Sequence, residues 1–165
     1  MTSYTIRHTC REDIPSIMKI YEAAKKIMRK DGNMNQWING YPSKEILEED
    51  IRRNVSYVVT QNKLIVATFA CIPGEDPTYK KIYEGRWLNS ILDYVTIHRL
   101  GSLPEYHGIA ISVFDFVSKL APSIRIDTHQ DNHIMKEILV KNGFTYCGII
   151  FLANNDERLA YQKIN

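Results

Sequence analysis

Aspartate and histidine alternate in the segment DTHQDNH, which runs from Asp127 to His133. On a β-strand, alternate side chains point to the same face, so these potential metal ligands could lie together. The apolar residues from Ile134 to Leu139, however, recur with a helical period, which makes Asp131 or Asn132 a natural N-cap. We therefore predict that the alternation breaks near Gln130, where a strand gives way to a capped helix, and we expect no bound metal. A metal-dependent hydrolase is the less favoured alternative.

The hydrophobic pattern predicts the elements that position this segment. We expect strands over 4–8, 56–60, 63–72, 92–100, 123–127, 144–152 and 158–164. We expect a first helix from a Thr9–Glu12 capping box to about Asp31, and a second from an N-cap at Ser43 to Ile51. We expect a third helix over 109–120 and a fourth over about 132–142, with Gly143 as its left-handed cap. This order predicts an α/β (α+β) fold, a single domain over residues 1–165 with a mixed central sheet flanked by about four helices.

Length, charge and cysteine content narrow the class of protein. A chain of 165 residues, 44% of them hydrophobic, can bury the core of one domain, and a formal net charge of +2 indicates neither a nucleic-acid nor a membrane partner. The longest apolar stretch, Leu64 to Ile72, is too short to span a membrane, and the N-terminus has no apolar run typical of a signal peptide. Three widely spaced cysteines predict no disulfide framework, so we expect a cytoplasmic protein.

The segment from Leu92 to Ile150 contains several short motifs in a fixed order: HRL, PEYHGIA, an asparagine at a helix start, and KNGFTYCGI. Together they resemble the core of the GNAT acetyltransferase superfamily, and the order of the elements is similar over nearly the whole chain. The resemblance implies a GNAT-like fold, acetyl-CoA as the co-substrate and an amine as the acetyl acceptor. It also implies that DTHQDNH forms the turn beside the cofactor, where Asn132 contacts the pantetheine arm.

The resemblance places the pyrophosphate of acetyl-CoA at the helix that begins near Gly108. A helix N-terminus offers free backbone N–H groups to anions, and small residues at Gly108 and Ala110 let the backbone approach the phosphates. In the family, the end of the preceding strand pairs with the pantetheine arm. The expected cofactor-binding residues are Leu100, Gly101, Ser102, His107, Gly108, Ile109, Ala110 and Asn132.

Two positions depart from the family pattern. Glu105 stands where the family usually has glutamine or arginine, and a carboxylate is a poor partner for a phosphate, although His107 could supply partial positive charge instead. Leu139 stands where many members carry the tyrosine that protonates the leaving thiolate. These departures motivate an alternative function, a GNAT-like module that binds an acyl-CoA without turnover.

Acyl transfer to an amine requires a group that removes a proton from the ammonium, whose pKa is about 10 in water. In the family a catalytic base often lies on the strand that contains His98, and an imidazole suits this role. The alternative for His98 is a hydrogen-bonded core histidine. Tyr106, Tyr146 and Cys147 are candidate proton donors, whereas His129 is better explained by the turn before the helix.

Two segments rich in aromatic residues are expected to wall the acceptor site. NQWINGYPS lies between the first two helices, and the loop PGEDPTYKKIYEGRWLNS is long for a compact domain, which favours a lid or a wall. In the family these regions surround the acceptor, and aromatic rings with nearby carboxylates suit a cationic amine. The alternative is ordinary packing beside a solvated loop. The candidate substrate residues are Trp37, Tyr41, Glu75, Asp76, Tyr79 and Tyr83.

The sequence therefore predicts an N-acetyltransferase that moves acetyl from acetyl-CoA to a primary amine of a small molecule or a peptide, with His98 as the base. The resemblance implies direct attack within a ternary complex, without a metal. We expect a monomer or a homodimer.

Overall fold

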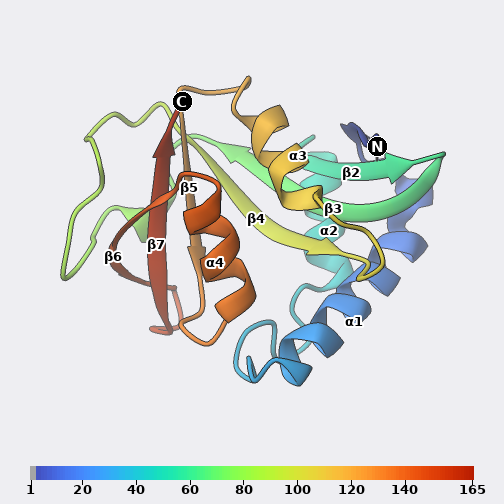
Figure 1. Cartoon of the computed structure of the whole chain (residues 1–165), viewed down its shortest axis with the longest axis horizontal. Helices are drawn as coiled ribbons and strands as arrows, with labels where there is room; N and C mark the ends of the chain where they lie inside the picture. The colour runs from blue at the N-terminus through green and yellow to red at the C-terminus, as the bar shows by residue number, and fades with distance from the viewer. Residues whose placement is uncertain (1–2) are drawn as a thin grey trace.

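A mixed sheet with helices on both faces forms the centre of the protein (Figure 1). The computed structural model describes residues 3–165. The strands are β1 (Thr5–His8), β2 (Ser56–Gln61), β3 (Leu64–Pro73), β4 (Val95–Ser102), β5 (Ser123–Thr128), β6 (Thr145–Phe151) and β7 (Glu157–Ile164), and their order in the seven-stranded sheet is β1-β2-β3-β4-β5-β7-β6. Only the β4–β5 pair is parallel among these. The predicted α/β class with a mixed sheet is confirmed.

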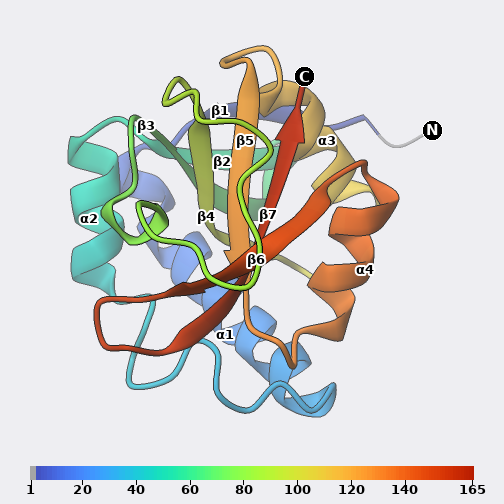
Figure 2. The ribbon, with the colours of Figure 1, turned by 90° about the vertical axis from the view of Figure 1, so that its left-hand side faces the viewer.

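Four α-helices flank the sheet, as predicted: α1 (Ile14–Lys30), α2 (Lys44–Arg52), α3 (Ile109–Val117) and α4 (His133–Lys141), with short 3₁₀ helices η1 (Arg11–Asp13) and η2 (Pro77–Tyr79). Figure 2 shows α3 and α4 on one side of the sheet and α1 and α2 on the other. Phe114, Ile124 and Leu139 belong to the larger core, under α3 and α4. Tyr21 and Leu47 belong to a second core, under α1 and α2. None of the helices within residues 3–165 has the length and hydrophobicity needed to cross a membrane.

The long loop between β3 and β4 packs against β6 and β7 instead of extending into solvent. Its Tyr79 and Tyr94 form a third cluster with Ile150 and Ala160. Ile124 and Ile126 of β5 point to the α3–α4 side of the sheet, so the alternate residues Arg125 and Asp127 point to the side that this loop covers.

The two parallel strands separate soon after they begin, and this separation creates the space for a site. β4 and β5 pair only at Val95–Ile124 and Thr96–Arg125. Beyond these pairs, β4 runs away from β5 (Figure 1). The edge of β4 that faces β5 therefore has no partner strand over most of its length.

A β-bulge accompanies the separation. Residues Thr68 and Ala70 of β3 lie opposite Gly101 and His98 of β4, so β4 contains one extra residue here. Arg99 has a left-handed φ of 55° within the bulge. The bulge changes the direction in which the side chains of β4 point after His98.

Several predicted boundaries are wrong. Thr9 does not form the expected capping box: its hydroxyl pairs with Ser56 Oγ at 2.7 Å, and Asp13 instead accepts the N–H of Cys10 at 2.7 Å. β4 begins at Val95 and continues to Ser102, because its pairing with β3 extends through the bulge. α3 ends at Val117, not at residue 120. The predicted N-cap at Ser43 is confirmed by its 3.1 Å bond from Ile46 N–H.

Candidate active site

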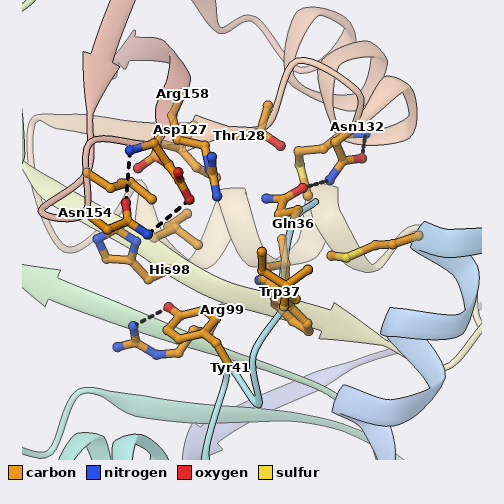
Figure 3. Close-up of a pocket in the computed structure, with 18 of the residues that line it drawn as sticks. Gln36, Trp37, Tyr41, His98, Arg99, Asp127, Thr128, Asn132, Asn154 and Arg158 are labelled. Atoms are coloured by element: carbon orange, nitrogen blue, oxygen red, sulfur yellow. Dashed lines mark hydrogen bonds between the residues drawn. The ribbon is translucent and has the colours of Figure 1, made fainter. Parts of the chain in front are cut away.

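Two cavities open where β4 and β5 separate. The first, named here the α3–α4 groove, has a volume of about 620 Å³ and lies between the free edge of β4 and helices α1, α3 and α4. The second, the hairpin cavity, has a volume of about 550 Å³ and lies between β4, β5, the α1–α2 loop and the β6–β7 hairpin (Figure 3). Met28, Leu100, Asn132 and Met135 line both. A molecule in the groove can therefore meet a molecule in the cavity.

The α3–α4 groove is lined by all the residues that the sequence predicts for cofactor binding, namely Leu100, Gly101, Ser102, His107, Gly108, Ile109, Ala110 and Asn132. Gly108 caps α3 with a φ of 74°, a left-handed conformation that glycine adopts at little cost. The first N–H groups of α3 have no partner within the helix and border the groove. This arrangement fits an anionic group. Glu105 is exposed and is not part of the groove lining.

A polar bridge joins the end of α1 to the start of α4 beside the junction of the cavities. Gln36 Oε1 accepts hydrogen bonds of 2.8 Å from Nδ2 of Asn33 and from Nδ2 of Asn132. Asn132 Oδ1 accepts the N–H of Met135 at 3.0 Å, which confirms the predicted N-cap. Asn33 Oδ1 is buried in the groove wall and has no partner within residues 3–165, so it is suited to an N–H of a ligand. The sequence did not mark Asn33, which stands in a helix-stop segment.

His98 lines the hairpin cavity and is oriented by a carboxylate of the β3–β4 loop. Its Nε2 lies 3.1 Å from Oδ2 of Asp76. Burial acts to raise the pKa of Asp76, but hydrogen bonds from His98 and Thr78 outweigh it and lower this pKa to about 2. An ionised Asp76 accepts a hydrogen bond from Nε2–H, which favours the tautomer with a free Nδ1. His98 therefore has one nitrogen held and the other available to accept a proton.

Asp127, at the end of β5, is held by a buried tyrosine. Tyr79 is 2% exposed and donates its hydroxyl hydrogen to Asp127 Oδ2 at 2.6 Å. Burial and the negative charge of Asp127 raise the pKa of Tyr79 well above its ordinary value, so the hydroxyl stays a donor. Trp87 packs on the Tyr79 ring and donates its indole N–H to the Tyr79 carbonyl at 2.9 Å. Tyr79 thus orients Asp127 and is not part of the lining of either cavity.

The bulge residue Arg99 anchors the opposite wall of the hairpin cavity. Its Nε and Nη2 each donate a 2.8 Å hydrogen bond to Asp50 of α2, and its Nη1 donates one of 3.0 Å to the Tyr41 hydroxyl. Burial opposes the positive charge, but Tyr41 and Asp50 outweigh burial and raise the pKa of Arg99. Arg99 therefore stabilises the bulge and positions Tyr41. The sequence did not predict the Arg99–Asp50 pair, because no spacing rule connects a bulge in β4 with α2.

The remaining candidate substrate residues are divided between the hairpin cavity and its surroundings. Trp37 is part of the cavity lining. Glu75 forms a 3.5 Å ion pair with Lys80 outside both cavities. Tyr83 is 47% exposed and packs edge-on against Phe151. The β6–β7 hairpin contributes cavity residues that the sequence did not identify, including Asn154, Asp156 and Arg158.

The candidate proton donors also occupy different places. Tyr106 lines the α3–α4 groove, whereas Tyr146 and Cys147 line neither cavity. Cys147 is buried, and its thiol donates to the Thr145 carbonyl. Leu139 is fully buried in the larger core. The position where many GNAT members have a tyrosine is therefore a core position in this chain.

The alternating residues of DTHQDNH diverge in space. Asp127 points toward Tyr79, His129 Nδ1 accepts the N–H of Asp131 at 3.0 Å, and His133 is the exposed first residue of α4. Burial and, next, the positive charge of Arg158 lower the pKa of His129. Within residues 3–165, no group of three or more His, Cys, Asp or Glu side chains is placed to share a metal ion.

Comparison with known proteins identifies similar structures. No protein-family model and no curated protein matches the chain. A GNAT-family acetyltransferase of Streptococcus agalactiae is 33% identical, with a TM-score of 0.88 and coverage of 98% of this chain and 95% of that chain. A GNAT-family acetyltransferase of Listeria monocytogenes is 18% identical (TM-score 0.71, coverage 98% and 95%). The ribosomal-protein-S18-alanine N-acetyltransferase of Escherichia coli is 14% identical (TM-score 0.61, coverage 98% and 94%). The last two similarities concern the fold alone.

Proposed function

The chain belongs to the GNAT family of acetyltransferases, and we propose that it transfers the acetyl group of acetyl-CoA to a primary amine of a small molecule or a peptide. One observation carries the proposal. The α3–α4 groove, which contains the N-terminus of α3, meets the hairpin cavity at the bulge of β4. The hairpin cavity contains His98, which is oriented by Asp76. The two substrates of an acetyl transfer need this kind of meeting point. We also propose a cytoplasmic location, which the free thiols of Cys10, Cys71 and Cys147 support.

The residues of the α3–α4 groove fit acetyl-CoA. The N–H groups at the start of α3, after Gly108, would hold the pyrophosphate. The free edge of β4 near Leu100 would pair with the amides of the pantetheine arm, and the unpartnered Asn33 Oδ1 would accept one amide N–H. When bound, acetyl-CoA would supply the acetyl group as an activated thioester. Glu105, a poor partner for a phosphate, is exposed and is not part of the groove lining, which supports this placement.

His98 is proposed as the general base of the hairpin cavity. Its free Nδ1 would take a proton from the acceptor amine, directly or through one water, while ionised Asp76 stabilises the imidazolium that forms. The deprotonated amine would then attack the thioester carbon at the junction of the cavities. The leaving group is a thiolate, whose conjugate acid has a pKa of about 8.5, so expulsion needs no strong protein acid. Leu139 in the core is compatible with this route.

The test measures thiol release from acetyl-CoA in the presence of a broad panel of primary amines. Turnover that depends on the amine, with acetylated product identified by mass spectrometry, would support the proposal. The rival function is an acyl-CoA-binding module without turnover, which the buried Leu139 favours. Acetyl-CoA would then raise the melting temperature by mass action, but no amine in the panel would accelerate thiol release.

A further inference from the structure

Arg158 of β7 is a buried cation that forms no ion pair within residues 3–165. The residue is 8% exposed and lines the hairpin cavity. Its only side-chain hydrogen bond within residues 3–165 runs from Nη1 to the backbone carbonyl of Glu157 at 2.9 Å, and its guanidinium takes part in none of the ion pairs there. A guanidinium has five N–H donors, so most of its donors remain unused. Burying a charge without a partner is costly, which indicates that a ligand supplies the partner.

The charged neighbours of Arg158 in the cavity are hydrogen-bonded to other groups. Asp156 is held in the hairpin turn by Asn154, whose Nδ2 donates to Asp156 Oδ2 at 3.0 Å. Burial and the charge of Arg158 lower the pKa of His129, which keeps that imidazole neutral. Asp127 accepts the Tyr79 hydroxyl hydrogen. Arg158 forms no ion pair with Asp127 or Asp156, which line the same cavity, so its unused N–H donors can receive a molecule there.

Arg158 and Asp127 face the same cavity from neighbouring strands. Asp127 is paired with Ala160, and Arg158 lies two residues from Ala160 on β7, so both side chains point to the same face of the sheet. Figure 3 shows Arg158, Asp127 and His98 around one cavity. The cavity thus presents a cationic group on β7 and carboxylate and imidazole groups on β5 and β4.

From this pairing of charges we infer that the acceptor is a small zwitterion, an amine that carries a carboxylate in the same molecule. The inference rests on the proposed acetyl transfer and names its substrate class. Arg158 would receive the carboxylate through paired N–H donors, a geometry that guanidinium and carboxylate share. The amine would then lie on the side of Asp127 and His98, toward the junction with the groove. Arg158 would be the specificity-determining residue.

The experiment compares free amino acids, including ω-amino acids of increasing chain length, with their matched amides in the thiol-release assay. We expect the wild-type protein to prefer the free acids in kcat/KM. Arg158→Gln should lower kcat/KM for the acids by about tenfold to a hundredfold, the usual effect of losing hydrogen bonds to a charged group, and should leave the amides nearly unchanged. Arg158→Lys should recover part of the preference, because it restores the charge without the paired donors. Arg53→Gln, at an exposed arginine after α2, is the matched control and should change neither.

The outcomes separate the two proposals. An equal loss for acids and amides in Arg158→Gln, or a wild-type protein that prefers amides, would overturn the zwitterion while acetyl transfer stands. Absence of turnover with every amine, although acetyl-CoA raises the melting temperature, would overturn the proposed function and the inference with it. The acetyl-CoA-induced shift in each variant reports whether it is folded, and Arg158→Lys replaces Arg158→Gln if the latter does not fold.

Discussion

The α3–α4 groove and the hairpin cavity are built from different kinds of groups. In the groove the expected donors are backbone N–H groups at the start of α3 and along the free edge of β4. In the cavity the polar groups are side chains, and the main ones are held by other side chains: His98 by Asp76, Asp127 by Tyr79, and Tyr41 by Arg99. Most groove side chains can therefore change without loss of its donors, whereas a single substitution in the cavity removes a functional group or its support.

This difference has a structural origin in β4. The pairing of β4 with β5 ends at Thr96, which frees the backbone on one side, and the bulge at Arg99 redirects the following side chains. One strand therefore serves the groove mainly with its backbone and the cavity mainly with the His98 side chain.

The largest effect is expected from a side chain that blocks the backbone N–H groups at the start of α3, in the α3–α4 groove. Gly108→Glu should abolish the rise in melting temperature that acetyl-CoA causes, because the residue has a φ of 74° and a carboxylate would stand where the phosphates bind. Glu105→Gln, at an exposed position outside the groove lining, is the control and should keep the full shift. An undiminished shift in folded Gly108→Glu would show that α3 is not the phosphate site.

The corresponding test of the hairpin cavity removes His98, its proposed base. His98→Ala should lower kcat by about a hundredfold or more, the usual effect of losing a general base, while the Kd of acetyl-CoA stays nearly unchanged. His133→Ala, at the exposed first residue of α4, is the matched histidine control and should keep kcat. A stable His98→Ala protein with near-normal kcat would remove His98 from the mechanism, and a lower melting temperature with normal kcat would make it a structural residue.

Substitution of the supporting carboxylate should have a smaller effect than removal of the base. Asp76→Asn should lower kcat by roughly tenfold, because the tautomer and orientation of His98 are less well held. The Kd of acetyl-CoA should stay nearly unchanged, because Asp76 lines neither cavity. A purely structural role for Asp76 would lower stability without lowering kcat in the folded fraction.

Asp76 should also contribute to stability in a defined pH range. Its pKa falls from an ordinary value of 3.8 to about 2 in the folded protein, so its contribution of about 2 kcal/mol is fully present above pH 3.8 and is lost as the pH falls through 2. Asp76→Asn should therefore unfold at lower denaturant concentration than the wild type at pH 7, and the difference should shrink below pH 4. A difference that is the same at pH 3 and pH 7 would contradict this account.

The contrast between the two sites also explains what the sequence could predict. Gly108, Ala110 and the helix that follows are consecutive in the chain, so a local motif was enough to locate the groove residues. The N-cap at Asn132 follows from a local rule in the same way. The cofactor role of these residues remains a prediction.

The hairpin cavity was harder to predict because its parts are distant in sequence. Asp76 and His98 are joined across a loop of irregular structure, and Arg158 reaches the cavity from β7 through the strand order β4-β5-β7. No periodic pattern encodes the bulge at Arg99 or its bond with Asp50. Tyr79 was predicted to line the acceptor site; its ring is buried, and its hydroxyl donates a hydrogen bond to Asp127, which lines the hairpin cavity.

The smallest expected effect concerns His129, whose pKa is influenced by the charge of Arg158. Burial and, next, Arg158 lower the pKa of His129, although Asp131, 3.7 Å away, opposes this shift. A histidine whose folded pKa lies below its ordinary value of 6.5 contributes stability that is present above pH 6.5 and is lost as the pH falls through the folded value. The wild type should therefore lose more stability between pH 7.5 and pH 5 than His129→Asn, whose side-chain oxygen can still accept the N–H of Asp131. When Arg158→Gln is also present, His129→Asn should change the loss of stability between pH 7.5 and pH 5 by a smaller amount. The reason is that Arg158→Gln removes the positive charge that disfavours protonation of His129. An unchanged difference in that background would show that burial alone sets the pKa of His129, and that the charge of Arg158 is already compensated within the cavity.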